Sequence, residues 1–181
     1  PDEIEHTYPD YSLYGIHNTA YGFLSRGCPR GCTFCIVGYK EGRRSRKVAN
    51  LDEFWRGQKN IVLCDPNILA CPDWQDLLGE LAESKAKVDI NQGWDARLLT
   101  EAKIEALHQI KLDAVHFAWD NYEDGSIILP KLEMYSQGCR KPHGHNAIVY
   151  VLCNYDTTIE QDLDRIYKLK SLGYWAYVML Y

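Results

Sequence analysis

Short apolar runs recur along the chain, and stretches with helical periodicity separate them. The runs have the length and the β-branched or aromatic composition of strands, and they lie at 20–26, 60–64, 88–90, 113–119, 147–153 and 174–181. Patterns typical of helices fill the intervals at 51–58, from Asp73, from Thr100, from Ser126 and from Thr158. The sequence therefore predicts a strand–helix unit that is repeated five times and followed by a sixth strand.

Several helix ends carry recognisable signals. Asp73, Thr100 and either Thr157 or Thr158 can cap the first turn of a helix, and Gly173 follows the last turn of the final one. A proline inside a helix removes a hydrogen bond and clashes with the preceding turn, so we expect the helix near Pro130 to start around Lys131.

The alternation of strands and helices predicts the topology. Strands joined by crossover helices run parallel, and near-continuous apolar strands such as 60–64 and 147–153 suit a parallel sheet covered on both faces. We expect an α/β fold, a partial (βα)6 parallel barrel of the TIM type, formed by residues 20–181 behind a leader segment at 1–19. Its ligand site belongs at the carboxyl ends of the strands, where the strand-to-helix loops meet.

Composition and charge argue against several classes of protein. The 181 residues carry 25 acidic and 20 basic side chains, a net charge of −5, and 46% of them are hydrophobic, which fits one packed domain. No apolar run approaches the roughly 20 residues that span a bilayer, so no membrane is expected as a partner. The mild acidity also argues against nucleic acid as a partner. Seven unevenly spread cysteines without an export signal favour a reduced, cytoplasmic protein.

Three of these cysteines form a compact motif. Cys28, Cys32 and Cys35 stand at the spacing C-x3-C-x2-C in a loop directly after the first strand. Thiolates bind iron–sulfur clusters, zinc or copper(I), and three of them leave one iron of a four-iron cubane open. A closed iron–sulfur cluster for electron transfer needs a fourth ligand such as Cys64, and structural zinc also needs a fourth donor, so these two alternatives stay open here.

The stretch YGFLSRGCPRGCTFCIV at 21–37 resembles the signature of the radical S-adenosylmethionine (radical SAM) superfamily. The motif follows the first strand of a chain of βα units, and Phe34 is the aromatic residue before the last cysteine. The flanking stretches at 9–15 and 41–55 resemble radical SAM cores that follow a cobalamin-binding domain in longer proteins. The resemblance thus implies a radical SAM barrel, as a fragment of a longer protein.

The resemblance also implies an activity. In the superfamily, cysteines such as Cys28, Cys32 and Cys35 hold a [4Fe–4S] cluster whose open iron binds S-adenosylmethionine. Reductive cleavage then gives methionine and a 5′-deoxyadenosyl radical, which abstracts hydrogen from the substrate. The chain would be an enzyme, an oxidoreductase or transferase of unknown substrate, that takes electrons from a reductant such as flavodoxin or ferredoxin. Cobalamin would come from a domain outside this chain.

Two sets of residues near the first two strands match cofactor contacts of the superfamily. Phe34 would pack near the adenine, and the backbone around Ile36 would meet its edge. The usual Gly-Gly-Glu-like segment, which receives the methionine amino group, is replaced by Cys-Asp-Pro-Asn, so the resemblance transfers that role to Asp65 and Asn67. The same four residues are also an ordinary turn.

Later loops supply further candidates. Arg97 could hold the cofactor carboxylate, with Gln92 or Asp95 helping to position the ribose or the substrate, although Arg97 could equally pair with Asp95. Asp120 is a candidate partner of the ribose hydroxyl groups. Asn154 stands where the superfamily has a glycine-containing motif on the fifth strand.

Smaller signals compete with this interpretation. Cys139, His143 and His145 form C-x3-H-x-H, which fits zinc or an exposed loop. Cys64 and Cys71 could approach a cluster or be small buried residues. The basic run at 40–47 could meet phosphate, although a solvated loop is the simpler interpretation.

Overall fold

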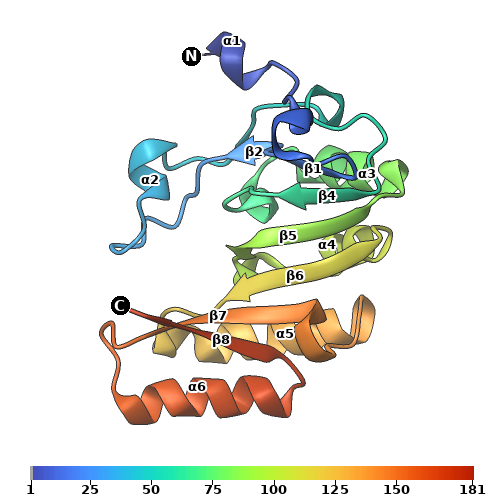
Figure 1. Ribbon diagram of the computed structural model, residues 1–181. Helices are drawn as coiled ribbons and strands as arrows, with labels where there is room; N and C mark the ends of the chain where they lie inside the picture. Colours follow the sequence, from blue (N-terminus) through green and yellow to red (C-terminus); the bar gives the residue numbers. More distant parts are fainter. Residues whose placement is uncertain (1) are drawn as a thin grey trace.

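The computed structural model describes residues 2–181, which are built around a six-stranded parallel sheet (Figure 1). The strands are β1 (Thr19–Gly22), β4 (Asn60–Leu63), β5 (Lys87–Trp94), β6 (Leu112–Ala118), β7 (Ala147–Cys153) and β8 (Trp175–Leu180). They lie in the sheet in the order in which they occur in the chain, and every neighbouring pair is parallel. The α/β fold with six parallel strands is confirmed.

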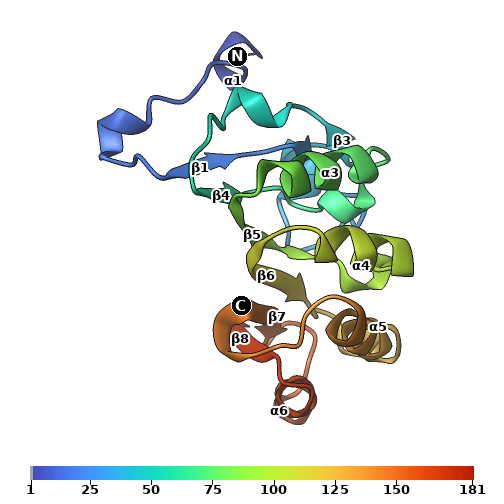
Figure 2. The same ribbon diagram turned by 90° about the vertical axis from the view of Figure 1, so that its right-hand side faces the viewer.

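Four long helices connect the last five strands. They are α3 (Trp74–Ser84), α4 (Glu101–His108), α5 (Gly125–Gly138) and α6 (Ile159–Ser171). Crossovers between parallel strands are right-handed, so strands added in one direction place their helices on one side of the sheet. Figure 2 shows α3, α4 and α5 on that side and α6 beside the end of the sheet formed by β7 and β8. None of the described helices is long and apolar enough to cross a membrane.

The sheet has two open edges. Strand β1 pairs only with β4, strand β8 pairs only with β7, and no pairing joins these edges within residues 2–181. A barrel is therefore not confirmed, although the strands follow one another across the sheet in chain order, as they do in a barrel. Closure depends on curvature and on edge pairing, which a pattern of apolar runs does not encode.

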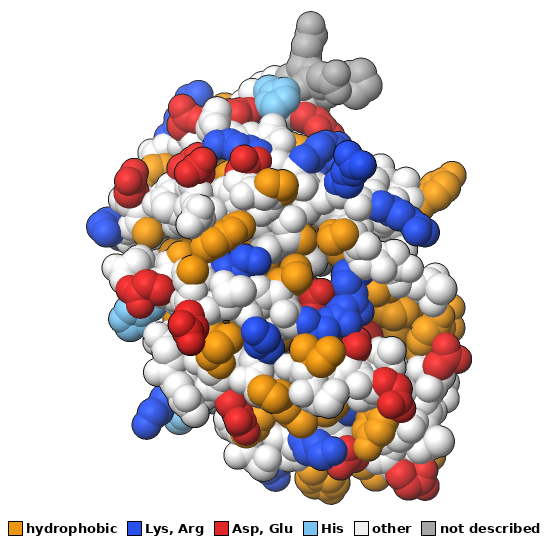
Figure 3. All heavy atoms as spheres, turned by 180° about the vertical axis from the view of Figure 1, so that it is seen from behind, with side chains coloured by type: hydrophobic (Ala, Val, Ile, Leu, Met, Phe, Trp, Pro, Cys, Tyr) orange, Lys and Arg blue, Asp and Glu red, His pale blue; other side chains and the backbone are white. Residues whose placement is uncertain are grey.

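The main core lies between the sheet and the helices. Leu77, Leu78 and Leu81 of α3 are fully buried, and so are Trp94 at the end of β5 and Trp119 after β6. The outer side of the molecule is solvated, and Figure 3 shows Lys, Arg, Asp and Glu side chains interspersed with hydrophobic ones on the side away from the viewer of Figure 1. No helix among residues 2–181 covers the opposite, inner face of the sheet, where the cavity lined by Gln92, His116 and Tyr150 lies.

Two predicted helices need correction. Of the helix expected at 51–58, only the 3-10 turn Leu51–Glu53 forms, because Gly57 adopts a positive φ of 89° and the Trp55 Nε1–H donates to the Gln58 carbonyl at 2.9 Å. Helix α5 begins at Gly125 and runs through Pro130, so the start expected near Lys131 is wrong. Pro130 is exposed, and water can satisfy the carbonyl that lost its partner.

The predicted caps mostly form. The Thr100 hydroxyl accepts the Lys103 N–H, and the Thr158 hydroxyl accepts the Gln161 N–H, at 3.3 Å in both cases. Gly173 has the expected positive φ of 84°. Asp73 makes no side-chain cap.

The segment before β1 is tied to the domain. Beyond Pro1, which lies outside the described residues, it forms the short helix α1 (Asp2–Glu5) and a 3-10 turn at Tyr11–Tyr14. The Tyr11 hydroxyl donates to the Phe54 carbonyl at 2.9 Å and accepts the Tyr21 N–H at 2.9 Å. The division into a leader at 1–19 and a core at 20–181 stays a prediction.

Candidate functional site

A small hairpin frames the cysteine loop. The strand predicted at 20–26 is divided into β1 and β2 (Ser25–Arg26), and β2 pairs antiparallel with β3 (Arg46–Lys47). Between them lie the three cysteines and the one-turn helix α2 (Val37–Lys40). Figure 1 shows this loop at the side of the sheet to which β4, β5 and β6 point, which is the carboxyl end.

Backbone contacts fix the start of the loop. The Gly27 N–H donates to Glu41 Oε2 at 3.0 Å, and the Cys28 N–H donates to the Gly42 carbonyl at 3.1 Å. Gly27 has a φ of 87°, and a Cβ atom there would lie 2.2 Å from the Arg44 carbonyl oxygen. Only glycine fits this position, so the residue before the first cysteine is dictated by the turn.

All three cysteines line one pocket. Cys28, Cys32 and Cys35 share it with Asn67 from the loop after β4 and with Asp120 from the loop after β6. Burial raises the pKa of the Cys32 thiol, and a hydrogen bond from the Arg30 guanidinium opposes that rise. No three His, Cys, Asp or Glu side chains within residues 2–181 surround a position for a single metal ion. The thiols of a cubane each bind a different iron, so they need to share a pocket rather than one ion.

Asn67 carries an unusual oxygen. The side chain is 2% exposed, and its Nδ2 donates to Cys28 Sγ at 3.6 Å. Its Oδ1 is buried and has no hydrogen-bond partner among the described residues. A buried acceptor left without a donor is costly, so this oxygen fits a ligand N–H in the cysteine pocket.

Asp65 lies behind the pocket instead of lining it. Its carboxylate accepts the Leu24 N–H at 3.0 Å, the Ser25 hydroxyl at 2.6 Å and the Ser25 N–H. Burial raises its pKa to about 6, against these hydrogen bonds. Both oxygens are used to hold the chain between β1 and β2.

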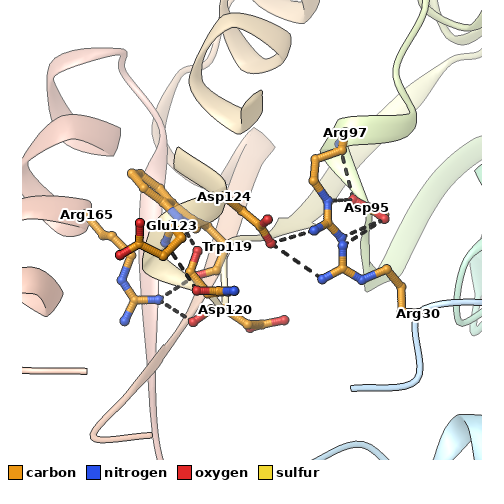
Figure 4. A network of polar contacts seen from close by, with 9 residues as sticks. Arg30, Asp95, Arg97, Trp119, Asp120, Glu123, Asp124 and Arg165 are labelled. Atoms are coloured by element: carbon orange, nitrogen blue, oxygen red, sulfur yellow. Dashed lines mark hydrogen bonds and ion pairs between the residues drawn. The ribbon is translucent and has the colours of Figure 1, made fainter. Parts of the chain in front are cut away.

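Two arginines and two aspartates form one wall of the pocket (Figure 4). Arg97 binds Asp95 through Nε at 2.7 Å and Nη2 at 2.9 Å, and it binds Asp124 through Nη1 at 2.5 Å. Arg30 reaches the same carboxylates less closely, at 3.4 Å and 3.6 Å. The pairing of Arg97 with Asp95, which the sequence left open, is thus formed.

A buried arginine supports the floor of the site. Nη1 of Arg165 donates to the Trp119 and Asp120 carbonyls at 2.7 and 2.8 Å, as Figure 4 shows, and Nη2 donates to the Leu152 carbonyl at 2.7 Å. The side chain of Asp120 lines the pocket, and burial raises its pKa to about 6, against Arg30 and Arg165.

Phe34 meets the loop after β7. The Phe34 and Tyr155 rings are in edge contact with centroids 5.3 Å apart, and the Tyr155 hydroxyl is hydrogen bonded to the Thr33 hydroxyl. Asn154 and Asp156, on either side of Tyr155, have positive φ values of 63° and 49°. These two left-handed residues turn Tyr155 toward the cysteine loop.

The other predicted residues lie around this pocket or away from it. The Ile36 carbonyl accepts N–H groups of the first turn of α2, and its side chain is exposed. Gln92 lines a neighbouring cavity on the inner face of the sheet. Asn154 points away, because its side-chain amide donates to the Tyr181 carbonyl at 3.3 Å.

The competing cysteine signals do not assemble with this pocket. Cys64 lines a different cavity beside the N-terminal segment, and Cys71 is buried. The ring of His145 packs on Trp175 at 4.3 Å, and the described residues hold no metal site of Cys139, His143 and His145. In the basic run, Lys47 pairs with Glu80 at 2.9 Å.

Sequence reasoning missed Arg30, Asp124 and Tyr155 as site residues. Arg30 is the one basic residue between the first and second cysteines, which is a usable signal. The contacts of Asp124 and Tyr155 with the cysteine loop arise from the fold, and nothing local in the sequence marks them.

Comparisons with known proteins agree with the cysteine motif. No protein-family model matches the chain. A CDK5RAP1-like protein of Oryza sativa subsp. japonica is 30% identical over 102 residues, 51% of this chain and 17% of that protein. Two tRNA-2-methylthio-N(6)-dimethylallyladenosine synthases are similar over more of the chain. That of Staphylococcus haemolyticus is 28% identical over 80% of the chain and 27% of its own length, and that of Karelsulcia muelleri is 27% identical over 85% and 36%.

The matched region thus covers 36% or less of these relatives. Their similarity supports a relation of the chain to the radical SAM superfamily and to enzymes generally. It gives no support for a cobalamin-binding domain.

Proposed function

We propose that this chain is the core of a radical SAM enzyme, in which Cys28, Cys32 and Cys35 hold a [4Fe–4S] cluster and the adjoining pocket holds S-adenosylmethionine. The carrying observation is that three thiols of one short motif line a single pocket together with the buried side chain of Asn67, whose amide oxygen has no hydrogen-bond partner among the described residues. When bound, the cluster supplies the electron that cleaves a carbon–sulfur bond of S-adenosylmethionine and so initiates radical chemistry on a substrate.

The donor set suits an open cluster. Three thiolates leave one iron free for a ligand, whereas structural zinc sites are closed by four protein donors. The Arg30 guanidinium opposes the rise that burial causes in the pKa of the Cys32 thiol, so it would also favour the thiolate that binds iron.

Residues of the pocket divide the cofactor contacts among them. Asn67 Oδ1 accepts from the methionine amino group, a role that Asp65 is less suited to fill because its oxygens are already bonded. Arg30 is held less tightly by carboxylates than Arg97 and is the more available partner for the cofactor carboxylate. Phe34, which contacts Tyr155, would pack against the adenine, and Asp120, which lines the pocket, would bind the ribose.

The substrate and partners are less constrained. A reductant such as flavodoxin or ferredoxin would supply the electron. The two synthases named above act on tRNA by their names, which opposes the expectation from charge that nucleic acid is no partner. The chain spans only part of those proteins.

Electron paramagnetic resonance (EPR) of the anaerobically reconstituted and reduced protein tests the proposal. We expect a [4Fe–4S]+ signal that shifts when S-adenosylmethionine is added, because the open iron changes its ligands. Cys32→Ser should abolish the signal. Stoichiometric zinc without iron, or a signal indifferent to the cofactor, would contradict the proposal.

Cys64→Ser is the matched control. Cys64 is half-buried and lines a separate cavity, so its replacement should leave both the cluster and the shift unchanged. Loss of the cluster in this variant would instead identify Cys64 as a fourth ligand of a closed electron-transfer cluster.

A further inference from the structure

A second cavity adjoins the cysteine pocket on the inner face of the sheet. It has a volume of about 550 Å3, and its walls come from four successive strands through residues such as Gln92, His116, Tyr150 and Tyr177. This size is typical of small-molecule sites. Phe34, Cys35 and Asp120 line both cavities, so a molecule in the second would lie beside the contents of the first.

Flat rings shape this cavity. His116 on β6 stacks parallel to Tyr150 on β7, with centroids 5.3 Å apart and planes at 11°. Tyr177 on β8 meets Tyr150 edge-on at 5.6 Å. The Tyr150 hydroxyl donates to the Asn91 carbonyl at 3.1 Å, which fixes the ring. A planar ligand gains most from such a surface because aromatic rings prefer stacked or edge contacts.

The polar groups of the cavity include the imidazole ring of His116, whose hydrogen-bond partner identifies the nitrogen that carries a proton. His116 is 8% exposed, and its Nδ1 lies 2.5 Å from the Ile90 carbonyl oxygen. A carbonyl only accepts, so Nδ1 carries a proton, and in the form of the ring with a single proton Nε2 is an acceptor. The site therefore favours a ligand that donates an N–H or O–H.

The charged side chains around the cavity restrict the charge of the ligand that it can bind. Within residues 2–181, no Lys or Arg side chain lines this cavity, whereas Asp120 does. A phosphate or carboxylate placed here would be desolvated without a cation, which is unfavourable. Aromatic faces attract cations, so a positively charged ring is accommodated as well as a neutral one.

From these features we infer that the inner-face cavity binds a planar, uncharged or cationic ring of the substrate that donates a hydrogen bond, and excludes its anionic groups. The inference rests on the proposed function, because the ring is substrate only if the neighbouring pocket holds the radical-generating cofactor. It adds His116, Tyr150 and Tyr177 as residues that determine specificity.

Three probes of equal ring size test the charge and donor preference. We would titrate benzamide, benzamidine and benzoate into the reconstituted protein with S-adenosylmethionine and follow binding by saturation-transfer NMR. Benzamide and benzamidine should bind saturably, and benzoate at least tenfold more weakly. Equal binding of benzoate would overturn the inference.

Variants locate the binding. His116→Phe keeps a stacked ring and removes the acceptor nitrogen. Tyr150→Leu removes the aromatic ring on which the ligand would stack. Each variant should weaken the binding of benzamide at least fivefold. Tyr177→Ser should disturb folding least of the three variants, because Tyr177 is 52% exposed. It should weaken the binding of benzamide about threefold. Tyr167→Ser on the outer helix α6, at a residue 64% exposed, is the control and should bind as the wild type. Unchanged binding in all three cavity variants would reject the site.

The two proposals fail separately. A cluster signal that responds to S-adenosylmethionine, with no binding of benzamide, rejects only the ring site. A missing cluster signal in a protein whose benzamide binding falls in the cavity variants rejects the proposed function, and with it the identification of the ring as substrate.

Discussion

At the scale of single residues, the unpartnered oxygen of Asn67 gives the sharpest prediction. Asn67→Ala should leave the cluster in place and weaken the binding of S-adenosylmethionine at least about tenfold, because a hydrogen bond to a charged group contributes roughly 1.5–3 kcal/mol. An EPR titration of the cofactor-dependent shift measures this.

The control for this variant is its stability. The variant removes an acceptor that has no partner and one hydrogen bond, from Nδ2 to Cys28 Sγ, so it should lower the free energy of unfolding in urea by no more than about 1.5 kcal/mol. Cofactor affinity equal to that of the wild type would remove Asn67 from the binding site.

Asp65 predicts a dependence of stability on pH. Its pKa rises from 3.8 in the ordinary carboxyl to about 6 in the folded chain because the group is buried. Between pH 4 and 6 the folded protein then holds a proton that the unfolded chain has lost, so this group contributes stability at low pH and loses it as the pH rises through 6.

The comparison with Asp65→Asn isolates that contribution. The free energy of unfolding should be measured in urea at pH 7 and at pH 5 for both proteins. The wild type should become about 1–2 kcal/mol more stable relative to the variant when the pH is lowered from 7 to 5. A constant difference between the two proteins would show that Asp65 stays ionised in the fold.

Residues of the site differ in how far the sequence reveals them. The three cysteines and Asn67 stand in short segments directly after strands, so their meeting follows from the topology alone. The Arg30–Asp95 contact joins residues 65 positions apart and depends on side-chain directions. Asp65 lies in the predicted loop, but it turns back toward Ser25, a direction that residue type does not encode.

At the scale of elements, Arg165 ties α6 to the ends of two strands. It is fully buried and bonded to three backbone carbonyls and to Asp162 at 2.5 Å. Arg165→Met should therefore lower the free energy of unfolding by about 3 kcal/mol, because it leaves a buried carboxylate and several carbonyls without donors. Urea denaturation measures the loss, and a loss below about 1 kcal/mol would contradict the role.

Replacing Pro130 in the middle of α5 should increase the stability of the protein. Pro130→Ala restores the missing N–H within α5 and should raise the free energy of unfolding by about 1 kcal/mol, because the restored hydrogen bond outweighs the greater freedom of the unfolded chain. Thermal denaturation checks it. Glu133→Ala, at another exposed position of α5, is the control and should change stability by less than about 0.5 kcal/mol.

Elements with a continuous apolar run or a threonine cap were predictable, whereas β5 extends over Lys87–Trp94, well beyond the run expected at 88–90, and the shortest elements were not predicted. The run 147–153 matches β7 at both ends because its apolar residues are continuous, and α4 and α6 start at the predicted threonine caps. Helix α2 has one turn, and β2 and β3 have two residues each, which is too little for any periodicity to show.

At the scale of the whole molecule, the open sheet predicts a gradient of protection. Backbone amides of β5 and β6 have neighbours on both sides, whereas β8 is an edge strand with Trp175, Tyr177 and Leu180 exposed. Hydrogen exchange followed by mass spectrometry should be slowest in β5 and β6 and fastest in β8. Equal protection of β8 and β6 would show that something covers that edge.

The order of the strands also bears on how the chain is made. Since each new strand of the sheet is added beside the one before it, a chain leaving the ribosome can extend its sheet unit by unit without waiting for a distant partner. The walls of the cysteine pocket come from residues up to Ile128, so they can gather before β7 emerges. The proposed cluster could therefore be inserted during translation, before Arg165 has been made and donates to the Trp119 and Leu152 carbonyls.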